Sequence, residues 1–557
     1  MSNNLSRFSP VSDIDVLVVG AGGAGLSAAL EAASLGARVG IFTRNMYVSA
    51  DNRWSSGGGC TWKTHAFNAA VREDDDIEAH IADTLNGGYN IGDPALVKLL
   101  CAGSVEIVDW LSGLGIDLCN GEGSFDVRPF GGNGAARGVF KEDRLGWYIQ
   151  QALTREVSFS ELISVHTGYR LLDFLLDAGE IVGALLVDEG SGEKLKVFAR
   201  SVVVADGAGA SMYEPSAVSS DKTCDGIAAA LRAGAAVSDM EFVQFHPTGL
   251  VPENRVFVGT LVEEALRFDG ARLLGADGSR FMFNYDERGE QATRDVVSRG
   301  IYTEIRKGNG IDGNHVALDL SECPVNIEKV YPAMAERFRL AGLNLSAARY
   351  LPVCPTAHFM MGGIEIDTLC RTSINGLWAA GETATGVHGA NRLGGNGLSE
   401  ALVFGRVAGR GAAEVANRKR LAKGGEVPIA EYHKASKSPI GAHELLVQLR
   451  REMYANCGPL REKQGIERTL DTLSSLEERA SDWIIPCGDA APAYIQLTTT
   501  VRSLLIASRA IAGGALLREE SRGSHWRIDF PGKTASPGRI RWHFNQGELL
   551  PEFVAER

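Results

Sequence analysis

The chain has 557 residues, 45% of them hydrophobic and 22% charged, so it is too long for one hydrophobic core and has the composition of a soluble globular protein. Its net charge of −13, with no cluster of lysines and arginines, argues against binding to nucleic acid. The nine cysteines show no CxxC spacing and no apolar run reaches about 18 residues, so we expect a cytoplasmic protein with no metal site and no membrane-spanning segment.

A dinucleotide-binding pattern opens the chain. Residues 15–19 (DVLVV) predict a buried strand, residues 26–35 a helix, and residues 37–42 a second strand. The turn after the first strand carries a GxGxxG motif whose glycines are Gly20, Gly22 and Gly25. A chance glycine-rich loop would show the same letters, but the flanking strand and helix are those that place this fingerprint at the phosphates of a dinucleotide.

Two features after this motif bear on which dinucleotide is bound. The second strand is followed by Thr43 and Arg44 instead of the acidic residue that usually binds a ribose, which disfavours NAD and leaves FAD open. Residues 51–61 (DNRWSSGGGCT) form a second glycine-rich loop that would pass close to a flat ring or a phosphate, although alone it would be read as a flexible surface loop. The residues of this loop expected at the cofactor are Ser56, Gly57, Gly58 and Gly59.

The predicted secondary structure changes twice in the middle of the chain. Helices are predicted at 76–86, 94–114 and 146–155. Alternating residues at 169–176, 180–188 and 194–204 predict a small antiparallel sheet, whose last strand returns toward the first domain. From about residue 240 to 350, short strands, turns and charged helices mix, as in an inserted domain.

An anion-binding pattern follows late in the chain. Residues 376–382 predict a short buried strand, and residues 388–400 (HGANRLGGNGLSE) combine a histidine, an arginine and a run of glycines ahead of a helix predicted at 398–416. A helix N-terminus leaves N–H groups unpaired and an arginine matches a carboxylate, so this stretch predicts a site for an anionic or electron-rich group. The pattern is helical again over 432–480 and irregular over 522–557.

Several ordered motifs carry a family resemblance. Besides the glycine fingerprint they are Arg128–Gly132 (RPFGG), Met240–Gly249 (MEFVQFHPTG), Arg294–Arg299 (RDVVSR), His358–Gly363 (HFMMGG), Gly381–Glu382 (GE), His388–Gly395 (HGANRLGG) and Glu520–His525 (ESRGSH). With these motifs the chain resembles, over nearly its full length, the flavoprotein subunit of succinate dehydrogenase and fumarate reductase and its soluble relative L-aspartate oxidase. The resemblance implies an α/β protein with a Rossmann-like FAD-binding domain, an inserted α+β capping domain, a C-terminal helical domain and an irregular tail.

Domain boundaries and further cofactor contacts follow from these elements and this resemblance. The expected parts are the FAD-binding domain at 1–239 and 351–420, the capping (substrate) domain at 240–350, the helical domain at 421–515 and the tail at 516–557. Further residues expected to hold FAD are Asp225, Glu382, Asn396 and Leu398.

The resemblance also implies a reaction, which is hydride transfer between flavin N5 and a carbon next to a carboxylate in a fumarate- or succinate-like substrate. The residues would suit it, because His246, His358 and Arg392 can grip carboxylate oxygens through charge-assisted hydrogen bonds. A substrate held flat against the flavin then reacts as if the step were unimolecular.

Proton delivery is the second half of that reaction. By resemblance, Arg294 gives or takes the proton at the neighbouring carbon, and Glu264 and Arg267 form its relay. Their i,i+3 spacing puts Glu264 and Arg267 on one face of a turn. Outside this context, Arg294–Asp295 would be read as a structural ion pair and Glu264–Arg267 as a surface pair.

Two departures from the family stand out. The family's covalent FAD histidine would fall near Asn52, and His65 is too far along to replace it, so we expect non-covalent FAD. Glu263 stands where the family has a threonine that helps to hold the distal carboxylate beside His246. Unless Glu263 is protonated or turned away, it would repel that carboxylate, and the substrate would be neutral or cationic at this end.

Three functions remain open at this stage. The first is a dehydrogenase or reductase of a dicarboxylate-like substrate, and the second is an oxidase of the L-aspartate oxidase kind that uses O2 or fumarate as acceptor. The third, a non-catalytic FAD-binding scaffold, would predict the loss of Arg294 or Arg392, and both are present. The dehydrogenase complexes use an iron–sulfur subunit with a membrane anchor, and residues 432–480 could dock such a partner, whereas L-aspartate oxidase works alone.

Overall fold

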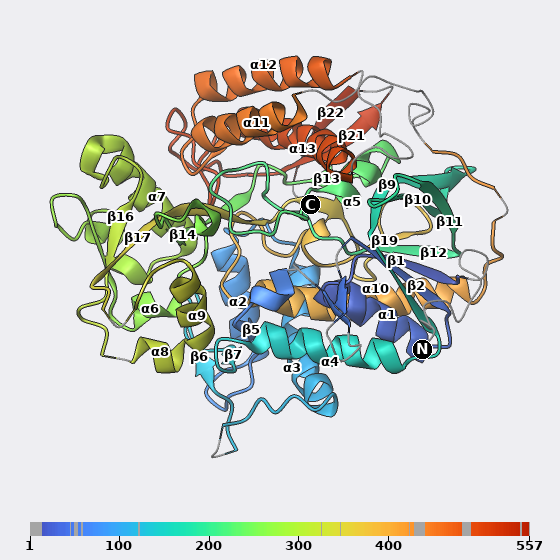
Figure 1. Cartoon of the computed structure of the whole chain (residues 1–557), viewed down its shortest axis with the longest axis horizontal. Coiled ribbons are helices and arrows are strands. Elements are labelled where there is room, and N and C mark those ends of the chain that lie inside the picture. Colours follow the sequence, from blue (N-terminus) through green and yellow to red (C-terminus); the bar gives the residue numbers. More distant parts are fainter. Residues whose placement is uncertain are drawn as a thin grey trace.

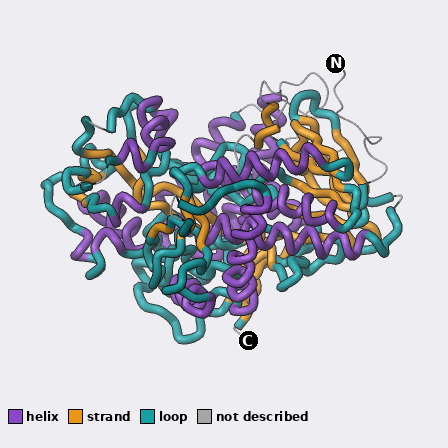
Figure 2. The backbone as a smooth tube through the Cα atoms, turned by 90° about the horizontal axis from the view of Figure 1, so that it is seen from below, coloured by secondary structure: helices purple, strands orange, loops and turns teal. Residues whose placement is uncertain are grey.

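The computed structural model describes residues 14–555 except for 45, 49–53, 57–59, 121–122, 325, 346, 423, 428–440, 482–491 and 546–547. Figure 1 shows three regions: a central α/β body, a lobe that carries α6 to α9 at one end of the long axis, and a layer of helices α11 to α13 across the body. The same lobe ends the long axis in Figure 2, where strands and helices mix in both halves of the molecule.

A five-stranded parallel sheet forms the centre of the body. Its strands, in order across the sheet, are β19 (Leu377–Ala379), β12 (Ser201–Val204), β1 (Val16–Val19), β2 (Val39–Thr43) and β8 (Ile163–Thr167). The first four are buried along their whole length, as their continuous apolar sequences require in a sheet that is covered on both faces. The predicted strand–glycine turn–helix–strand unit is confirmed, and the strand predicted at 376–382 joins the edge of this sheet.

Helices pack around this sheet close to where the sequence predicts them. They are α1 (Gly23–Ser34), α2 (Ile77–Gly87), α3 (Pro94–Gly113), α4 (Leu145–Phe159) and α10 (Asn396–Ala416); α5 (Asp225–Arg232) packs with them but was not predicted. Helices α1 and α10 lie against each other and share a core of small and branched apolar side chains with the sheet. The side chains of Asp76 and Asp93 cap α2 and α3, which explains where these two helices begin.

The antiparallel sheet predicted after α4 contains β9 (Tyr169–Asp177), β10 (Glu180–Asp188) and β11 (Lys194–Phe198). The single strand predicted at 194–204 is wrong, because the chain leaves this sheet after Phe198. The N–H of Ala199 still bonds to Val182 in β10, but that of Arg200 bonds to Asp15, and β12 continues in the parallel sheet. A break of two residues, Ala199 and Arg200, thus transfers the chain between two sheets.

The lobe has its own sheet and its own hydrophobic core. The sheet order is β14 (Val243–Leu250), β17 (Tyr350–Met360), β16 (Val316–Asp319) and β15 (Arg272–Leu274). Its helices are α6 (Ala265–Phe268), α7 (Arg294–Glu304), α8 (Ile327–Val330) and α9 (Pro332–Leu340). The long strands β14 and β17 pair along the lobe and carry the chain between it and the body, so residues at their inner ends lie at the junction.

Two small antiparallel sheets complete the body. They contain β3 (Met46–Val48) with β4 (Trp54–Ser56), and β5 (Ala66–Asn68) with β7 (Gly138–Phe140) and β6 (Val127–Arg128).

Three helices, α11 (Ala442–Cys457), α12 (Lys463–Ala480) and α13 (Pro492–Leu517), form the C-terminal layer. Among the described residues, α13 alone is long and apolar enough to cross a membrane by length and composition, but 67% of its most apolar window is buried inside the protein. It packs on α5, α11 and α12, so its apolar surface is used in the protein core.

The tail differs from the irregular segment that the sequence predicts. It forms an antiparallel hairpin of β21 (Arg539–Asn545) and β22 (Glu548–Val554), which joins a sheet with β13 (Val237–Ser238), β18 (Gly363–Glu365) and β20 (Ala384–Thr385). Ile540 and Trp542 are buried by this pairing while their neighbours are partly exposed. The alternation is too short to be recognised as a strand without its partner β13.

Candidate functional site

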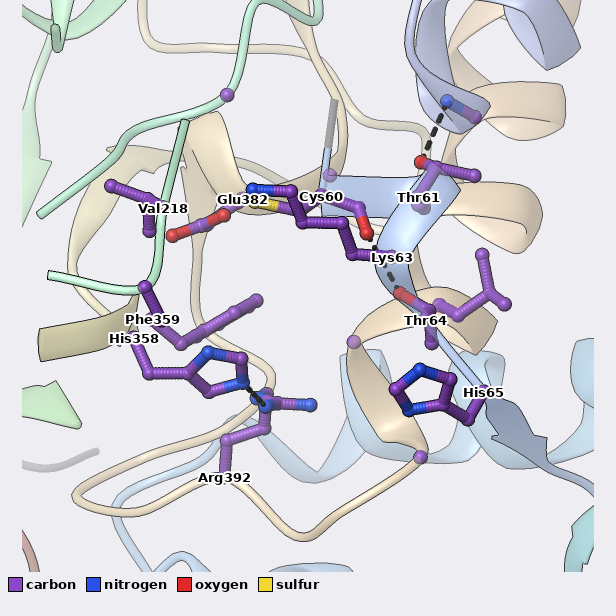
Figure 3. A pocket seen from close by; sticks show the side chains of 18 of the residues that line it. Cys60, Thr61, Lys63, Thr64, His65, Val218, His358, Phe359, Glu382 and Arg392 are labelled. Atoms are coloured by element: carbon purple, nitrogen blue, oxygen red, sulfur yellow. Dashed lines mark hydrogen bonds between the residues drawn. The ribbon is translucent and has the colours of Figure 1, made fainter. Parts of the chain in front are cut away.

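A large pocket lies between the body and the lobe, and Figure 3 shows the side chains that line it. Eight of the residues expected to be catalytic or to bind the cofactor line this pocket: Gly22, His246, Glu264, Arg294, His358, Glu382, Arg392 and Leu398. They come from the glycine turn, the junction strands β14 and β17, the starts of α6, α7 and α10, and the end of β19. The fold therefore gathers at one place motifs that are spread over most of the sequence.

The turn between β1 and α1 is tight because of two glycines. Gly20 has a φ of +104°, and a Cβ there would lie 2.5 Å from the carbonyl oxygen of Ala205 in the neighbouring strand. A Cβ on Gly25 would overlap the carbonyl oxygen of Gly20, so the first turn of α1 packs directly on the end of β1. Helix α1 begins without a side-chain cap, which leaves N–H groups of its first turn to the pocket; Thr61 accepts that of Gly23 at 3.0 Å.

A second, smaller pocket adjoins the first on the other side of the glycine turn. Gly20, Thr43, Arg44 and Asp225, all expected at the cofactor, line it together with Asp206, Asp221 and Lys222. The two pockets share Gly22 and Lys222 and so form one elongated site that passes the N-terminus of α1. This shape suits an extended dinucleotide with its phosphates at the helix N-terminus.

The charged groups of the smaller pocket are held in place by buried ion pairs. Asp225 binds the buried Arg170 at 2.8 Å; burial alone would raise its pKa, but Arg170 outweighs burial and lowers it. Arg44 binds Glu189 at 2.9 Å and the carbonyl of Asp221. Burial raises the pKa of Asp206 to about 6.

Helix α10 provides a second helix N-terminus at the larger pocket. Gly395, with a φ of +89°, precedes the helix, which has no side-chain cap. Asn396 points away from the pocket, because its side chain hydrogen-bonds Asn68 at 2.7 Å and Thr84 at 3.0 Å. It therefore fixes the start of the helix, and Leu398, two residues further along, lines the pocket.

Glu382 is the carboxyl group on the pocket wall next to the smaller pocket. It is half-buried and accepts the backbone N–H of Met360 at 3.1 Å. Burial raises its pKa to about 7, so it can donate a hydrogen bond at neutral pH. Figure 3 shows it beside Cys60, with the side chain of Lys63 extending toward them.

Arg392 is a cation with no carboxylate partner among the described residues. Its guanidinium donates to the neutral Gln244 at 3.2 Å and to Nε2 of His358 at 3.1 Å, it stacks on Phe359, and its Nε has no partner. Burial and the nearby Arg294 lower its pKa to about 9. An unpaired buried cation of this kind favours an anionic ligand.

Two of the histidines that line the pocket, His246 and His358, are neutral, and their tautomers follow from their contacts. Burial, followed by Arg294 and the other arginines, lowers the pKa of both His246 and His358 well below the usual value. Nε2 of His358 accepts from Arg392, so the proton of His358 is on Nδ1. The N–H of Thr248 donates to Nδ1 of His246 at 3.3 Å, so His246 carries its proton on Nε2.

Arg294, Glu264 and Arg267 form a continuous buried chain that leads away from the pocket. Glu264 accepts from Nε of Arg294 at 2.6 Å and pairs with Arg267 at 3.3 Å. Burial would raise the pKa of Glu264, but the two arginines lower it. The alternative readings are wrong: the Glu264–Arg267 pair is buried, and Asp295 accepts from Tyr89 at 2.6 Å instead of pairing with Arg294.

Glu263 has partners that the sequence did not suggest. Its Oε2 lies 2.6 Å from Nδ1 of His65, and its Oε1 lies 3.7 Å from Arg337 in α9. These contacts within the protein weaken the reason for the expected repulsion of a substrate carboxylate, which stays a prediction. His65 is far from Glu263 in sequence, and no spacing signal could have brought the two together.

Three other expectations concern this site. The side chain of Ser56 and the loop Gly57, Gly58 and Gly59 lie outside the described residues, as does Asn52. His388, part of the late anion-binding pattern, does not line the pocket; its Nε2 pairs with Glu400 at 3.0 Å in the interior. Residues that the sequence analysis missed, notably Gln244, Lys222 and Thr61, are identified by their contacts across the fold.

Comparison with known proteins agrees with this geometry. Residues 15–398 match a family model described as an FAD binding domain, and residues 447–542 match one described as the fumarate reductase flavoprotein C-terminus. The chain is 36% identical to one of the subunits of the fumarate reductase (CoM/CoB) of Methanothermobacter marburgensis, over 94% of this chain and 95% of that protein. It is 34% identical to the L-aspartate oxidase of Streptomyces coelicolor, over 92% and 88% of the two chains.

Solved structures show the same likeness. A mutant of E. coli quinol fumarate reductase FrdA superimposes with a TM-score of 0.89 at 28% identity, over 98% of this chain and 97% of that one. The Mycobacterium smegmatis Sdh1 structure in complex with UQ1 gives a TM-score of 0.85 at 30% identity, over 98% and 95% of the two chains.

Proposed function

Because the chain belongs to the flavoprotein family of fumarate reductase, succinate dehydrogenase and L-aspartate oxidase, and is thus an FAD-dependent oxidoreductase for a dicarboxylate-like substrate, we propose that it saturates or desaturates the C–C bond beside a substrate carboxylate. Arg392 is the residue on which this proposal mainly rests. It is a buried cation without a counterion among the described residues, set beside two neutral histidines at the junction of body and lobe. Such a set of donors binds a carboxylate and offers nothing to a cation.

In this proposal each residue of the pocket has one task. Arg392 binds one carboxylate of the substrate, and His246 donates from Nε2 to the other end. Gln244 accepts from both Arg294 at 3.1 Å and Arg392 at 3.2 Å, so it fixes the two guanidinium groups relative to each other. Bound FAD supplies or accepts the hydride. The elongated shape of the site and the two uncapped helix N-termini support the binding of FAD here.

Arg294 exchanges a proton with the carbon next to the one that exchanges the hydride. In the direction of reduction the carbon takes a proton from Arg294, and Glu264 returns one through its 2.6 Å hydrogen bond. Arg267 in turn gives a proton to Glu264, so that the guanidinium of Arg294 regains its own proton. Burial and Arg294 lower the pKa of Arg267, which makes it a better donor than an exposed arginine.

A screen of small carboxylic acids against the flavin tests this function. The purified protein is reduced anaerobically, and unsaturated mono- and dicarboxylates are added while the flavin absorbance is followed. We expect a fumarate-like acid to reoxidise the flavin at a rate that saturates with its concentration. If no unsaturated carboxylate reoxidises the flavin, the proposal fails.

The second candidate is an oxidase of the L-aspartate oxidase kind, which the 34% identity to the Streptomyces coelicolor enzyme favours. It uses the same carboxylate grip but takes hydride from a carbon that bears an amine. The release of hydrogen peroxide after L-aspartate is added in air would identify it. Flavin that stays oxidised with L-aspartate but is reoxidised by fumarate after reduction would exclude it.

An iron–sulfur electron-transfer protein is the partner we propose for the first function. The relative from Methanothermobacter marburgensis is named as one subunit of its fumarate reductase, so it works with at least one other. Affinity purification of the chain from its own cells, followed by iron analysis, would test this partner. Full activity of the isolated chain with O2 as acceptor would argue against it.

A further inference from the structure

We propose that His65, held by Glu263, recognises an anionic group at the far end of the substrate, opposite Arg392. The inference rests on the proposed carboxylate grip and extends it to the substrate's second end. It makes the substrate a dicarboxylate, whereas the sequence alone suggested a neutral or cationic far end.

The two side chains come from different parts of the fold. His65 precedes β5 in the body, and Glu263 precedes α6 in the lobe; both line the large pocket. Their 2.6 Å contact therefore bridges the two walls. Figure 3 shows the imidazole of His65 directed into the space that faces His358 and Arg392.

Several polar atoms lack partners at this end of the pocket and at Arg337, which does not line the pocket but lies next to Glu263. Within the described part of the chain, Nε2 of His65 and Oε1 of Glu263 have no hydrogen bond although both are buried. The same holds for Nε and one Nη of Arg337, whose Nη lies 3.7 Å from Oε1 of Glu263. Buried polar atoms without partners are costly, so a cluster of them at a pocket wall points to a ligand.

The proton positions follow from these contacts. Nδ1 of His65 faces a carboxylate, so it carries a proton and donates to Glu263. A ligand carboxylate at Nε2 would place the imidazole between two carboxylates, to each of which one ring N–H would donate. Glu263 and the nearby Asp143 are the anionic groups around this end, Arg337 and Lys63 are the cationic ones, and His246 is neutral.

The charge balance favours an anion at this end. Oε2 of Glu263 faces His65, and its Oε1 lies 3.7 Å from Arg337, so one carboxylate is shared between two donors. A second substrate carboxylate would accept from Nε2 of His65 and from His246. An ammonium group would find Oε1 of Glu263 as a free acceptor, but the cationic Arg337 already faces that atom.

Ligand binding to the FAD-loaded protein tests the inference without turnover. Flavin difference spectra are titrated with succinate and with butyrate, which has the same carbon chain but one carboxylate. We expect His65→Gln to weaken succinate binding by about 10- to 100-fold, the value of one charge-assisted hydrogen bond, and to change butyrate binding by less than about 3-fold. Glu263→Gln should give a smaller loss of the same selectivity, because the amide oxygen still accepts from Nδ1 but carries no negative charge.

A histidine–carboxylate pair outside the pocket gives a matched control. His543 pairs with Glu552 at 3.0 Å in the tail hairpin, and we expect His543→Gln to leave both titrations unchanged. If His65→Gln does not retain FAD, His65→Asn serves as the second variant.

Two results would overturn the inference while the proposed function stands: equal losses of succinate and butyrate binding in the His65 variants, or no loss of either. Tighter binding of 4-aminobutyrate than of succinate by the unaltered protein would also overturn it. If neither succinate nor butyrate perturbs the flavin of the unaltered protein, the carboxylate grip itself fails, and the inference fails with it.

Discussion

Replacing Glu264 by glutamine separates proton delivery from substrate binding. Glu264 is buried and accepts from Nε of Arg294 at 2.6 Å and from the N–H of Gly131 at 3.3 Å, and it pairs with Arg267 at 3.3 Å. The amide of Glu264→Gln cannot carry a proton between the two arginines, and we expect kcat to fall by about 10²- to 10⁴-fold, the usual range for lost acid–base catalysis. Binding of a carboxylate inhibitor should persist, because the pocket loses a negative charge.

The same substitution has a predictable cost in stability. Two buried arginines lose their shared counterion, and breaking a buried ion pair by removal of one partner costs about 3–5 kcal/mol. Urea unfolding of the FAD-loaded protein measures this loss, and dye-coupled reduction of fumarate measures kcat. The two measurements together distinguish a broken proton path from a general loss of structure.

Asp173→Asn is the matched control. Asp173 is a buried carboxylate that binds Arg232 at 3.0 Å in the antiparallel sheet, away from the pocket. We expect this variant to lose stability while it keeps its turnover. The reasoning is refuted if Glu264→Gln is destabilised as expected but retains more than about half of the kcat of the unaltered protein.

Three further predictions concern the walls of the pocket. A Cβ on Gly397 would lie 2.9 Å from Nη1 of Arg392, so Gly397→Ala should displace the guanidinium and weaken carboxylate binding by roughly 10- to 100-fold in flavin titrations; unchanged affinity would mean that Arg392 does not bind the ligand. The pKa of Glu382 is raised by burial from 4.5 to about 7, so its ionisation costs the FAD-free protein stability as the pH rises through this range, on the order of 3 kcal/mol. Glu382→Gln should therefore unfold at higher urea than the unaltered FAD-free protein at pH 8 but not at pH 4, and equal midpoints at pH 8 would contradict this. Acid precipitation should release all the flavin into the supernatant, whereas yellow colour in the pellet would show a covalent bond.

Local patterns were enough to predict the nucleotide-binding part of the fold. The strand, the glycine turn and helix α1 follow from a buried apolar run and from glycines whose Cβ atoms would clash, and both signals lie within about one supersecondary unit. The residues around the pocket could be singled out because their motifs are long and ordered. Helix bounds were predicted to within a few residues where aspartates cap them, as Asp76 and Asp93 do.

What the sequence could not predict depends on contacts between distant segments. Glu263 was expected to repel the substrate because its partner His65 belongs to another part of the fold, and only the closed junction brings the two to 2.6 Å. The change of sheet after Phe198 depends on which strand accepts each N–H, and the apolar pattern does not predict these hydrogen-bond partners. The tail hairpin likewise exists because β13 offers an edge to Trp542 and its neighbours.

The most direct test of the central claim is the reoxidation of reduced flavin by fumarate in the unaltered protein and in Arg294→Ala. Arg294 reaches the pocket from the start of α7 and contacts Glu264 at 2.6 Å, so its removal takes the proton donor away and leaves Arg392 in place. We predict rapid, saturable reoxidation in the unaltered protein, and in Arg294→Ala binding of fumarate with reoxidation slowed by about 10²-fold or more. Reoxidation at the same rate in both proteins would contradict the assignment of Arg294 as the group that exchanges the proton.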